Sequence, residues 1–243
     1  MAMSISQNAQ NLHNKSGLTK MPDEYYWGEI TQAEMRNINA VSRDEGWSVA
    51  VEEVLAKEYP GLVGMVTDED RVDWVHRFGA DTMEILDIGS GWGQASYLLA
   101  AKHNHNVTSL ELIPERAEFQ EIRASQEKLE NLSVTNGNIL DTNFDGKKFD
   151  LATLIGVLEW IGVDQRANDP REVQKLALTR IHNLLKDDGK VCIGIENRIG
   201  FNNFLGARDH SGFSFTSLMP RWLASAYLKM RNASYRSNTS QNT

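Results

Sequence analysis

The sequence is poor in cysteine and has no long apolar run. Its single cysteine, Cys192, excludes an internal disulfide and a metal site built from several cysteines, and it fits a reducing compartment. Apolar stretches such as LATLIGVLEWIGV from Leu151 are shorter than the roughly 20 residues of a membrane-spanning helix. The polar segment 1–22 lacks the apolar core of a secretory signal. We therefore expect a cytoplasmic protein with no membrane span and a flexible N-terminal arm over residues 1–22.

The sequence also contains fewer basic than acidic residues. The 33 acidic and 25 basic residues give a net charge of −8, which argues against a general nucleic-acid-binding protein. The balance is uneven, because the segment from Asn197 onward has a local surplus of positive charge. This contrast has two interpretations: a solubilising distribution of charge, or a surface that faces an anionic partner.

No internal repeat and no glycine- or proline-rich linker divides the chain. Before residue 80, apolar spacing predicts two short helices over 47–59 and 67–78, the second opening with a capping pattern from Thr67 to Asp70. From Met83 onward, short apolar runs alternate with helical spacing. The expected strands are 83–88, 106–112, 132–136, 149–155 and 190–196, and the expected helices are 91–103, 114–129 and 171–186, the last ended by Gly189. This order predicts an α/β, Rossmann-like fold with a mostly parallel sheet and helices on both faces.

The first of these strands ends in a glycine-rich turn, LDIGSGWG, in which Gly89, Gly91 and Gly93 follow Asp87 at alternate positions. Glycine permits a positive φ and lets a ligand approach the backbone, and the free amide groups at the start of the next helix can bind a carboxylate. A glycine-rich turn alone is weak evidence, because a tight structural turn or a dinucleotide site has a similar sequence.

Three further features narrow the interpretation. Gln94 stands where a dinucleotide motif of the form GxGxxG has its third glycine, which disfavours a nicotinamide-dependent oxidoreductase. Glu111 ends the second strand, where a carboxylate can accept hydrogen bonds from both hydroxyls of a ribose. Asn138 and Ile139 follow the third strand, where one side chain can bind an adenine amine and the other can pack on its ring.

The ordered motifs ILDIGSGWG, the Glu111 strand end, GNIL, FDLATLIGVLEWIG and LLKDDGKVCIGIENR resemble those of class I S-adenosylmethionine-dependent methyltransferases, over residues 83–198. The resemblance implies S-adenosyl-L-methionine as methyl donor and S-adenosyl-L-homocysteine as product, with no metal. It also implies ten cofactor-binding residues: Asp87, Gly89, Gly91 and Gly93 around the methionine part, Glu111 at the ribose, Asn138 and Ile139 at the adenine, Gly156 beneath the sulfonium, and Ser90 and Leu112 elsewhere in the cofactor site. Trp160 departs from the pattern, because many relatives have a histidine after the residue that corresponds to Glu159.

A less specific resemblance concerns the acceptor. The segment from Glu196 to Ala224 is similar to methyltransferase domains associated with bacterial surface-polysaccharide synthesis, which implies O-methylation of a glycan or glycan-linked acceptor. The basic residues after Asn197 would suit an anionic acceptor. A small-molecule methyltransferase and a non-catalytic S-adenosylmethionine-binding regulatory or scaffold domain are the alternatives, since acceptor pockets vary on a shared scaffold.

An alcohol acceptor needs a general base to remove its proton. His210 is our first candidate, because a neutral imidazole is available near pH 7 and the loop after the fifth strand lies at the sheet edge where acceptors enter. The other candidates are Asp209, Glu159 and Glu196. A histidine bonded within its own loop is the competing structural interpretation of His210.

We expect four segments: the arm 1–22, a helical cap 23–80, the cofactor-binding core 81–196, and an acceptor-side loop and helix 197–243. A complete fold of the class has two further strands after the fifth, and the sequence offers no candidate for them. Because an open sheet edge invites association, we expect either a fragment of a longer protein with a downstream domain or a homodimer that covers the edge.

Overall fold

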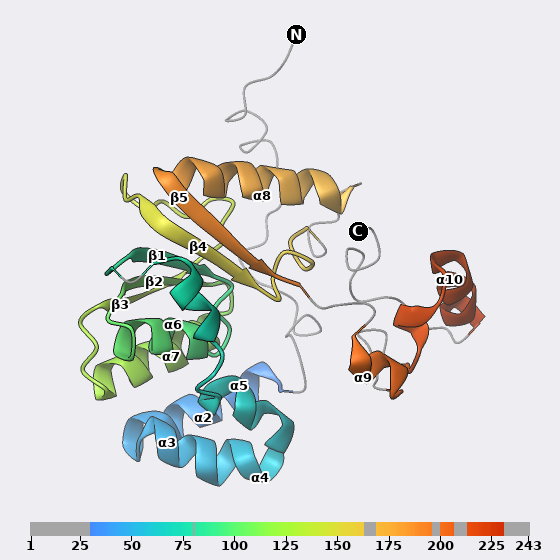
Figure 1. Cartoon of the computed structure of the whole chain (residues 1–243). Coiled ribbons are helices and arrows are strands. Elements are labelled where there is room, and N and C mark those ends of the chain that lie inside the picture. Colours follow the sequence, from blue (N-terminus) through green and yellow to red (C-terminus); the bar gives the residue numbers. More distant parts are fainter. Residues whose placement is uncertain (1–29, 80, 163–168, 196–199, 207–212, 231–243) are drawn as a thin grey trace. The chain divides into compact units, whose positions relative to one another are not determined.

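Five strands form one parallel sheet in the order β3-β2-β1-β4-β5 (Figure 1). The computed structural model describes residues 30–79, 81–162, 169–195, 200–206 and 213–230. The strands are β1 (Glu84–Ile88), β2 (Asn106–Glu111), β3 (Leu132–Asn136), β4 (Phe149–Ile155) and β5 (Leu185–Gly194). The predicted α/β class with a parallel sheet is confirmed, and the strand at 149–155 has the predicted bounds.

The register of the sheet places apolar side chains in its interior. Ile85 of β1 pairs with Val107 of β2 on one side and with Leu151 of β4 on the other, and all three are buried. Strand order reverses between β1 and β4. Strands β2 and β3 lie on one side of β1, whereas β4 and β5 lie on its other side. In open parallel sheets, the carboxyl ends of the strands at such a reversal form a crevice where ligands bind.

Two crossover helices, α6 (Gln94–Ala101) and α7 (Pro114–Gln126), cover one face of the sheet (Figure 1). They connect β1 to β2 and β2 to β3. The connection from β4 to β5 contains α8 (Pro170–Leu184) and runs in the opposite direction across the sheet, so a right-handed crossover places it on the other face. Helices on both faces follow from this topology.

An N-terminal helical region packs on α7. Its elements are α2 (Gln32–Asp44), α3 (Trp47–Ala50), η2 (Val51–Leu55), α4 (Ala56–Glu58), η3 (Pro60–Leu62), α5 (Val63–Thr67) and η4 (Asp73–Arg77). Met35, Ile38 and Leu55 are fully buried in a cluster that also contains Trp92 of the glycine-rich turn and Phe119 of α7. The helical region and the turn after β1 therefore share one hydrophobic core.

Two helix predictions need correction, and one helix was missed. The helix predicted over 67–78 is wrong, because the Asp68 carboxylate accepts the Asp70 N–H at 3.0 Å and closes a local turn, leaving only the short η4. The helix α2 was not predicted. The helix predicted over 171–186 ends at Leu184, and Gly189, which was expected to terminate it, lies within β5. A β-carbon at Gly189 would approach the Phe149 carbonyl oxygen to 2.9 Å.

The chain divides into two compact units. The first contains residues 1–154 and 180–192, and the second contains residues 155–179 and 193–243. The predicted cap and most of the predicted core thus fall in one unit, while the predicted boundaries at residues 22, 80 and 196 stay predictions.

The second unit contains α9 (Phe201–Phe204), η5 (Thr216–Leu218) and α10 (Arg221–Met230). The elements described after Gly194 are helical, and within residues 200–206 and 213–230 they include none of the two further strands typical of a complete fold. Among the helices described, none combines the length and the apolar character needed to cross a membrane.

Candidate functional site

The turn between β1 and α6, residues 89–93, is held open by left-handed backbone conformations. Gly89, Gly91 and Gly93 have φ values of 64°, 60° and 76°. The Gly89 and Ser90 N–H groups both donate to the Leu110 carbonyl of β2, at 2.8 and 3.2 Å. We call residues 89–93 the glycine loop. It lies at the carboxyl ends of β1 and β2, at the point where strand order reverses.

Two glycines of the loop differ in the space beside their backbone. A β-carbon on Gly91 would have no atom within 4 Å, so the space beside this backbone is open. A β-carbon on Gly93 would lie 2.5 Å from the Gln120 Cγ, so Gly93 allows α7 to pack closely against the loop. Gly93 is also the N-cap of α6 and supplies no side chain to the first N–H groups of that helix. Such groups favour a bound carboxylate.

The Glu111 carboxylate connects the glycine loop to the end of β2. It accepts the Gly91 N–H at 2.7 Å and the Ile113 N–H at 2.9 Å, one on each oxygen. The residue is buried, and burial raises the pKa of Glu111 against the opposing effect of the Arg116 charge and the two backbone donors. Each carboxylate oxygen can accept two hydrogen bonds, so each retains capacity for one further donor.

Asp87 is buried inside the sheet. Ser96 of α6 and Thr153 of β4 each donate a hydroxyl hydrogen bond to it at 2.6 Å. Burial raises the pKa of Asp87, and the two hydroxyls oppose that shift. The carboxylate therefore joins three elements beneath the glycine loop, with one side-chain hydroxyl bonded to each of its oxygens.

Leu112 and the two residues predicted at the adenine, Asn138 and Ile139, lie in the turns after β2 and β3. Leu112 is partly exposed, at 37%, and Ile139 is buried. The Asn138 side chain accepts the Leu140 N–H at 3.0 Å, which closes the turn after β3. Asn136 joins the two turns, because its amide donates to the Glu111 and Leu112 carbonyls at 2.9 and 3.1 Å.

A family model described as a methyltransferase domain matches residues 80–204, just over half of the chain. The match begins before β1 and ends at α9, so it includes the glycine loop and Glu111. The chain belongs to this family of S-adenosylmethionine-dependent methyltransferase domains. Its sheet has the Rossmann-like methyltransferase fold, as the sequence predicted.

Known proteins resemble this methyltransferase domain at a distance. A tRNA (guanine-N(7)-)-methyltransferase from Lactobacillus helveticus (strain DPC 4571) is 34% identical over 104 residues, which are 42% of this chain and 46% of the relative. The chain thus spans about half the length of that relative. The CcbJ methyltransferase from Streptomyces caelestis is 18% identical, with a TM-score of 0.45 over 57% of this chain and 53% of that one. Coclaurine N-methyltransferase is 16% identical, with a TM-score of 0.45 over 79% and 60%.

The residues predicted for the methyl and acceptor side belong to the second unit or lie outside the described residues. Gly156 has a φ of 69°, and its N–H donates to the Gly194 carbonyl at 2.8 Å, so it joins the ends of β4 and β5. Glu159 is buried in the turn that follows. His210, Asp209 and Glu196 lie outside the described residues.

Gln120 and Arg123 of α7 were not predicted to contribute to the methyltransferase domain's site. Gln120 is buried and bonds to the glycine loop, and Arg123 is buried between the rings of Trp47 and Tyr97. The sequence places Gln120 on the apolar side of a predicted helix but does not identify its partners. Gln120 falls on the stripe of buried positions that runs from Ala117 to Ala124, where a polar residue requires a partner.

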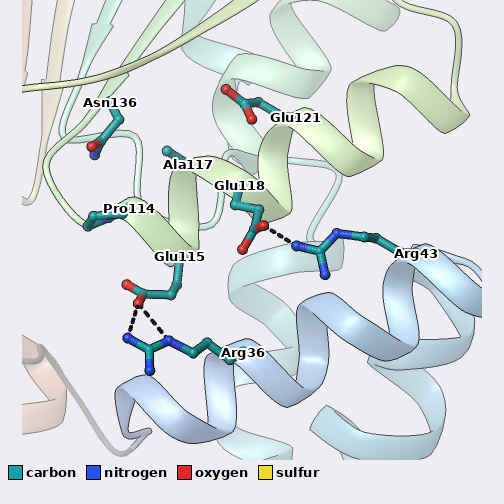
Figure 2. Close-up of a pocket in the computed structure, with 8 residues that line it drawn as sticks. All are labelled: Arg36, Arg43, Pro114, Glu115, Ala117, Glu118, Glu121 and Asn136. Atoms are coloured by element: carbon teal, nitrogen blue, oxygen red, sulfur yellow. Dashed lines mark hydrogen bonds and ion pairs between the residues drawn. The ribbon is translucent and has the colours of Figure 1, made fainter.

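A separate hollow of about 600 Å³ lies where α2 meets α7 (Figure 2). Two ion pairs cross it: Arg36 contacts Glu115 at 3.1 Å, and Arg43 contacts Glu118. None of the ten predicted cofactor residues lines this hollow. We therefore regard it as part of the contact between the helical region and the sheet of the methyltransferase domain.

Proposed function

We propose that this domain binds S-adenosylmethionine at the glycine loop and Glu111 and catalyses O-methylation of a glycan or glycan-linked acceptor. The observation that carries the donor site is the shared placement of Gly91 and Glu111. Open space lies beside the Gly91 backbone, and a buried carboxylate contacts the same residue. The whole protein's activity and acceptor belong to this proposal, because the chain spans only part of its curated relative.

The residues present fit an S-adenosyl nucleoside. The uncapped first turn of α6 would hold the carboxylate of the amino-acid tail. Glu111 would accept the ribose hydroxyls with its remaining lone pairs, and Leu112, Asn138 and Ile139 would border the adenine. Asp87 would act indirectly, by fixing the first turn of α6 against β1 and β4 through Ser96 and Thr153.

The bound donor supplies a methyl group on a positively charged sulfur, which leaves as a neutral thioether when the methyl is transferred. The protein's own contribution is to hold the two reactants in line and to keep water out. Correct positioning can lower such a barrier by up to roughly 7–11 kcal/mol. Removing the hydroxyl proton of the acceptor requires a base, for which His210 is the first candidate and Asp209, Glu159 and Glu196 are the others.

Two features of the sequence support a glycan acceptor. The segment from Glu196 to Ala224 resembles domains associated with polysaccharide synthesis, and the excess of basic residues after Asn197 suits an anionic group on the acceptor. The net charge of −8 disfavours a nucleic acid as the acceptor.

The single cysteine, Cys192, is free, which supports a reducing compartment such as the cytoplasm.

The proposal is tested by methyl transfer from S-adenosylmethionine carrying a labelled methyl group. Acceptors of three classes are offered: anionic and neutral oligosaccharides, bulk tRNA, and small amines and alcohols. We expect label in an oligosaccharide, together with stoichiometric S-adenosylhomocysteine. Label in tRNA or in an amine would contradict the acceptor class. Binding of the donor without turnover on any acceptor would support the non-catalytic alternative.

The base is tested with the same assay in three variants. If His210 is the base, His210→Ala loses turnover by about 100-fold or more while the affinity for S-adenosylhomocysteine is unchanged. Asp209→Asn and Glu159→Gln are the comparisons, and a large loss in either of them, with His210→Ala active, would reassign the role.

A further inference from the structure

Gln120, on α7, is 2% exposed and connects three parts of the donor region. Its amide nitrogen donates to the Gly91 carbonyl and to the Ser90 Oγ, each at 2.8 Å. Its amide oxygen accepts the Ser109 hydroxyl of β2 at 2.5 Å. One buried side chain therefore ties the glycine loop both to the helix and to the neighbouring strand.

The chemistry of its partners fixes the orientation of this amide. The Gly91 carbonyl can only accept a hydrogen bond, so the nitrogen of Gln120 must face it. Gly91 is then held from two sides, because its N–H donates to Glu111 and its carbonyl accepts from Gln120. The side of Gly91 where a β-carbon would stand is open.

Packing gives independent support. The Gln120 Cγ, Cδ and Oε1 atoms lie 2.5, 2.6 and 2.8 Å from the place where a β-carbon of Gly93 would stand. Gln120 can reach the Gly91 carbonyl only because position 93 has no side chain. The glycine at 93 and the glutamine at 120 thus depend on each other, although 27 residues separate them in the sequence.

We propose that Gln120 is a positioning residue for the methyl donor, which sets the Gly91 carbonyl and the course of the loop beneath the donor's amino-acid tail. This inference rests on the proposed donor site. Gln120 acts through the backbone and does not itself contact the donor. Its loss therefore affects ligands that carry the amino-acid tail more than ligands that carry the nucleoside alone, because Glu111 retains the Ile113 N–H as a second donor.

The experiment compares two ligands on three proteins by calorimetry. S-adenosylhomocysteine has the amino-acid tail, and 5′-methylthioadenosine has the same nucleoside without it. The proteins are the unaltered chain, Gln120→Met, and Glu121→Met as a control at an exposed position of the same helix. In Gln120→Met we expect the dissociation constant for S-adenosylhomocysteine to rise at least tenfold and that for methylthioadenosine to change less than threefold. In Glu121→Met neither should change.

Equal changes for the two ligands in Gln120→Met, or no change in either, would overturn the inference while leaving the donor site in place. If the unaltered chain binds neither nucleoside, the proposed function fails and this inference fails with it. Thermal unfolding midpoints separate a loss of stability from a loss of binding. Should Gln120→Met not fold, Ser109→Ala removes the anchor of Gln120 on β2 together with the Ser109 hydroxyl contact to the Ser90 Oγ, and the ratio of the two affinities should still shift in the same direction.

Discussion

The Glu111 carboxylate binds two backbone N–H groups, and a ligand at this site would bind the same carboxylate. The two N–H groups fix the position of both oxygens. A preorganised acceptor loses little freedom when ribose hydroxyls bind, so the contact contributes more than a mobile surface carboxylate would. The same burial that fixes the group also makes its charged form harder to maintain.

The affinity for S-adenosylhomocysteine should fall as the pH is lowered. Burial raises the pKa of Glu111 above its usual value of 4.5, so protonation begins at a higher pH than for an exposed glutamate, and a protonated carboxyl accepts fewer hydrogen bonds. Glu111→Gln should bind about 10- to 100-fold more weakly at pH 8, since a hydrogen bond to a charged group is worth roughly 1.5–3 kcal/mol. Calorimetry at a series of pH values measures both effects.

The control is Glu130→Gln, an exposed carboxylate in the turn before β3. It should reproduce the pH profile of the unaltered chain, whereas Glu111→Gln should show a flatter one. A profile that keeps its slope in Glu111→Gln would mean that another group controls the affinity.

Single residues differed in how far the sequence could identify them. Glu111 could be proposed as a site residue because a strand end is a local feature and acidic residues are uncommon in a buried strand. Gln120 was not, because its partners Ser90 and Ser109 come from other elements and meet it only in the folded chain. Open space at Gly91 and a close contact at Gly93 are likewise properties of the fold, although both positions are glycine in the sequence.

At the scale of elements, Arg123 fastens the N-terminal helices to the sheet. Its guanidinium lies 4.0 Å from the centre of the Trp47 ring and 3.7 Å from that of Tyr97, and it donates to the Val66 carbonyl and to Gln94. Burial lowers the pKa of Arg123 to about 10, so the group stays charged at neutral pH. Gln94 is the first residue of α6, which places this contact directly beside the glycine loop.

Arg123→Met should destabilise the protein by about 3 kcal/mol, through the loss of two cation–π contacts and two buried hydrogen bonds. Urea unfolding measures this change. Hydrogen exchange should also accelerate in residues 30–67, because these helices lose their attachment to α7. Lys128→Met, at an exposed cation just after α7, should change the unfolding free energy by less than about 0.5 kcal/mol. Equal effects of the two variants would contradict the role of Arg123.

Three histidines meet at the amino-terminal ends of β1 and β2. The rings of His76 and His103 lie 5.1 Å apart and those of His103 and His105 lie 6.1 Å apart, and the Met83 N–H donates to the His105 Nδ1 at 3.2 Å. Burial lowers the pKa of His103, assisted by His76, and burial lowers the pKa of His105, assisted by His103.

These shifts predict a loss of stability in acid. The unfolded state binds protons at the ordinary histidine pKa of about 6.5, while the folded state binds them only at lower pH, so the free energy of unfolding falls as pH drops below about 6.5. His105→Asn keeps an acceptor for the Met83 N–H and cannot titrate, so its urea midpoint should fall less between pH 7.5 and 5.5. His182→Asn, at an exposed position of α8, should behave like the unaltered chain, and the same slope in all three proteins would contradict this explanation.

Strands β1, β2 and β4 were predictable because each is a short apolar run bounded by turn residues. The strand predicted over 190–196 begins earlier, at Leu185, because the polar residues 186–188 gave no strand signal. The helical region was harder to predict. A capping box at Thr31 and Glu34 marks the start of α2, but polar residues such as Asn39 occupy part of its buried face and conceal the apolar period. The segment after Thr67 has helical spacing, and the competing hydrogen bond of the Asp68 side chain ends the helix there. Side chains that bond to their own backbone override such a period.

At the scale of the whole molecule, the residues proposed for the donor and those proposed for the acceptor differ in character. The glycine loop, Glu111 and Gln120 lie in the unit built on the sheet, whose sequence is strongly acidic. Gly156, Glu159 and the basic segment after Asn197 belong to the other unit. Donor binding follows from a shared scaffold, and acceptor choice depends on segments that vary between relatives. This difference explains why the motifs predicted the cofactor more sharply than the acceptor.

The central claim is that the glycine loop and the ends of β2 and β3 form the donor site. Hydrogen exchange measured by mass spectrometry, with and without S-adenosylhomocysteine, tests it most directly, because the method reports where the ligand binds. We expect slower exchange in peptides that cover residues 89–96, 111–113 and 138–142, with the hollow between α2 and α7 unaffected. Protection confined to that hollow, or no protection at a saturating concentration of ligand, would contradict it.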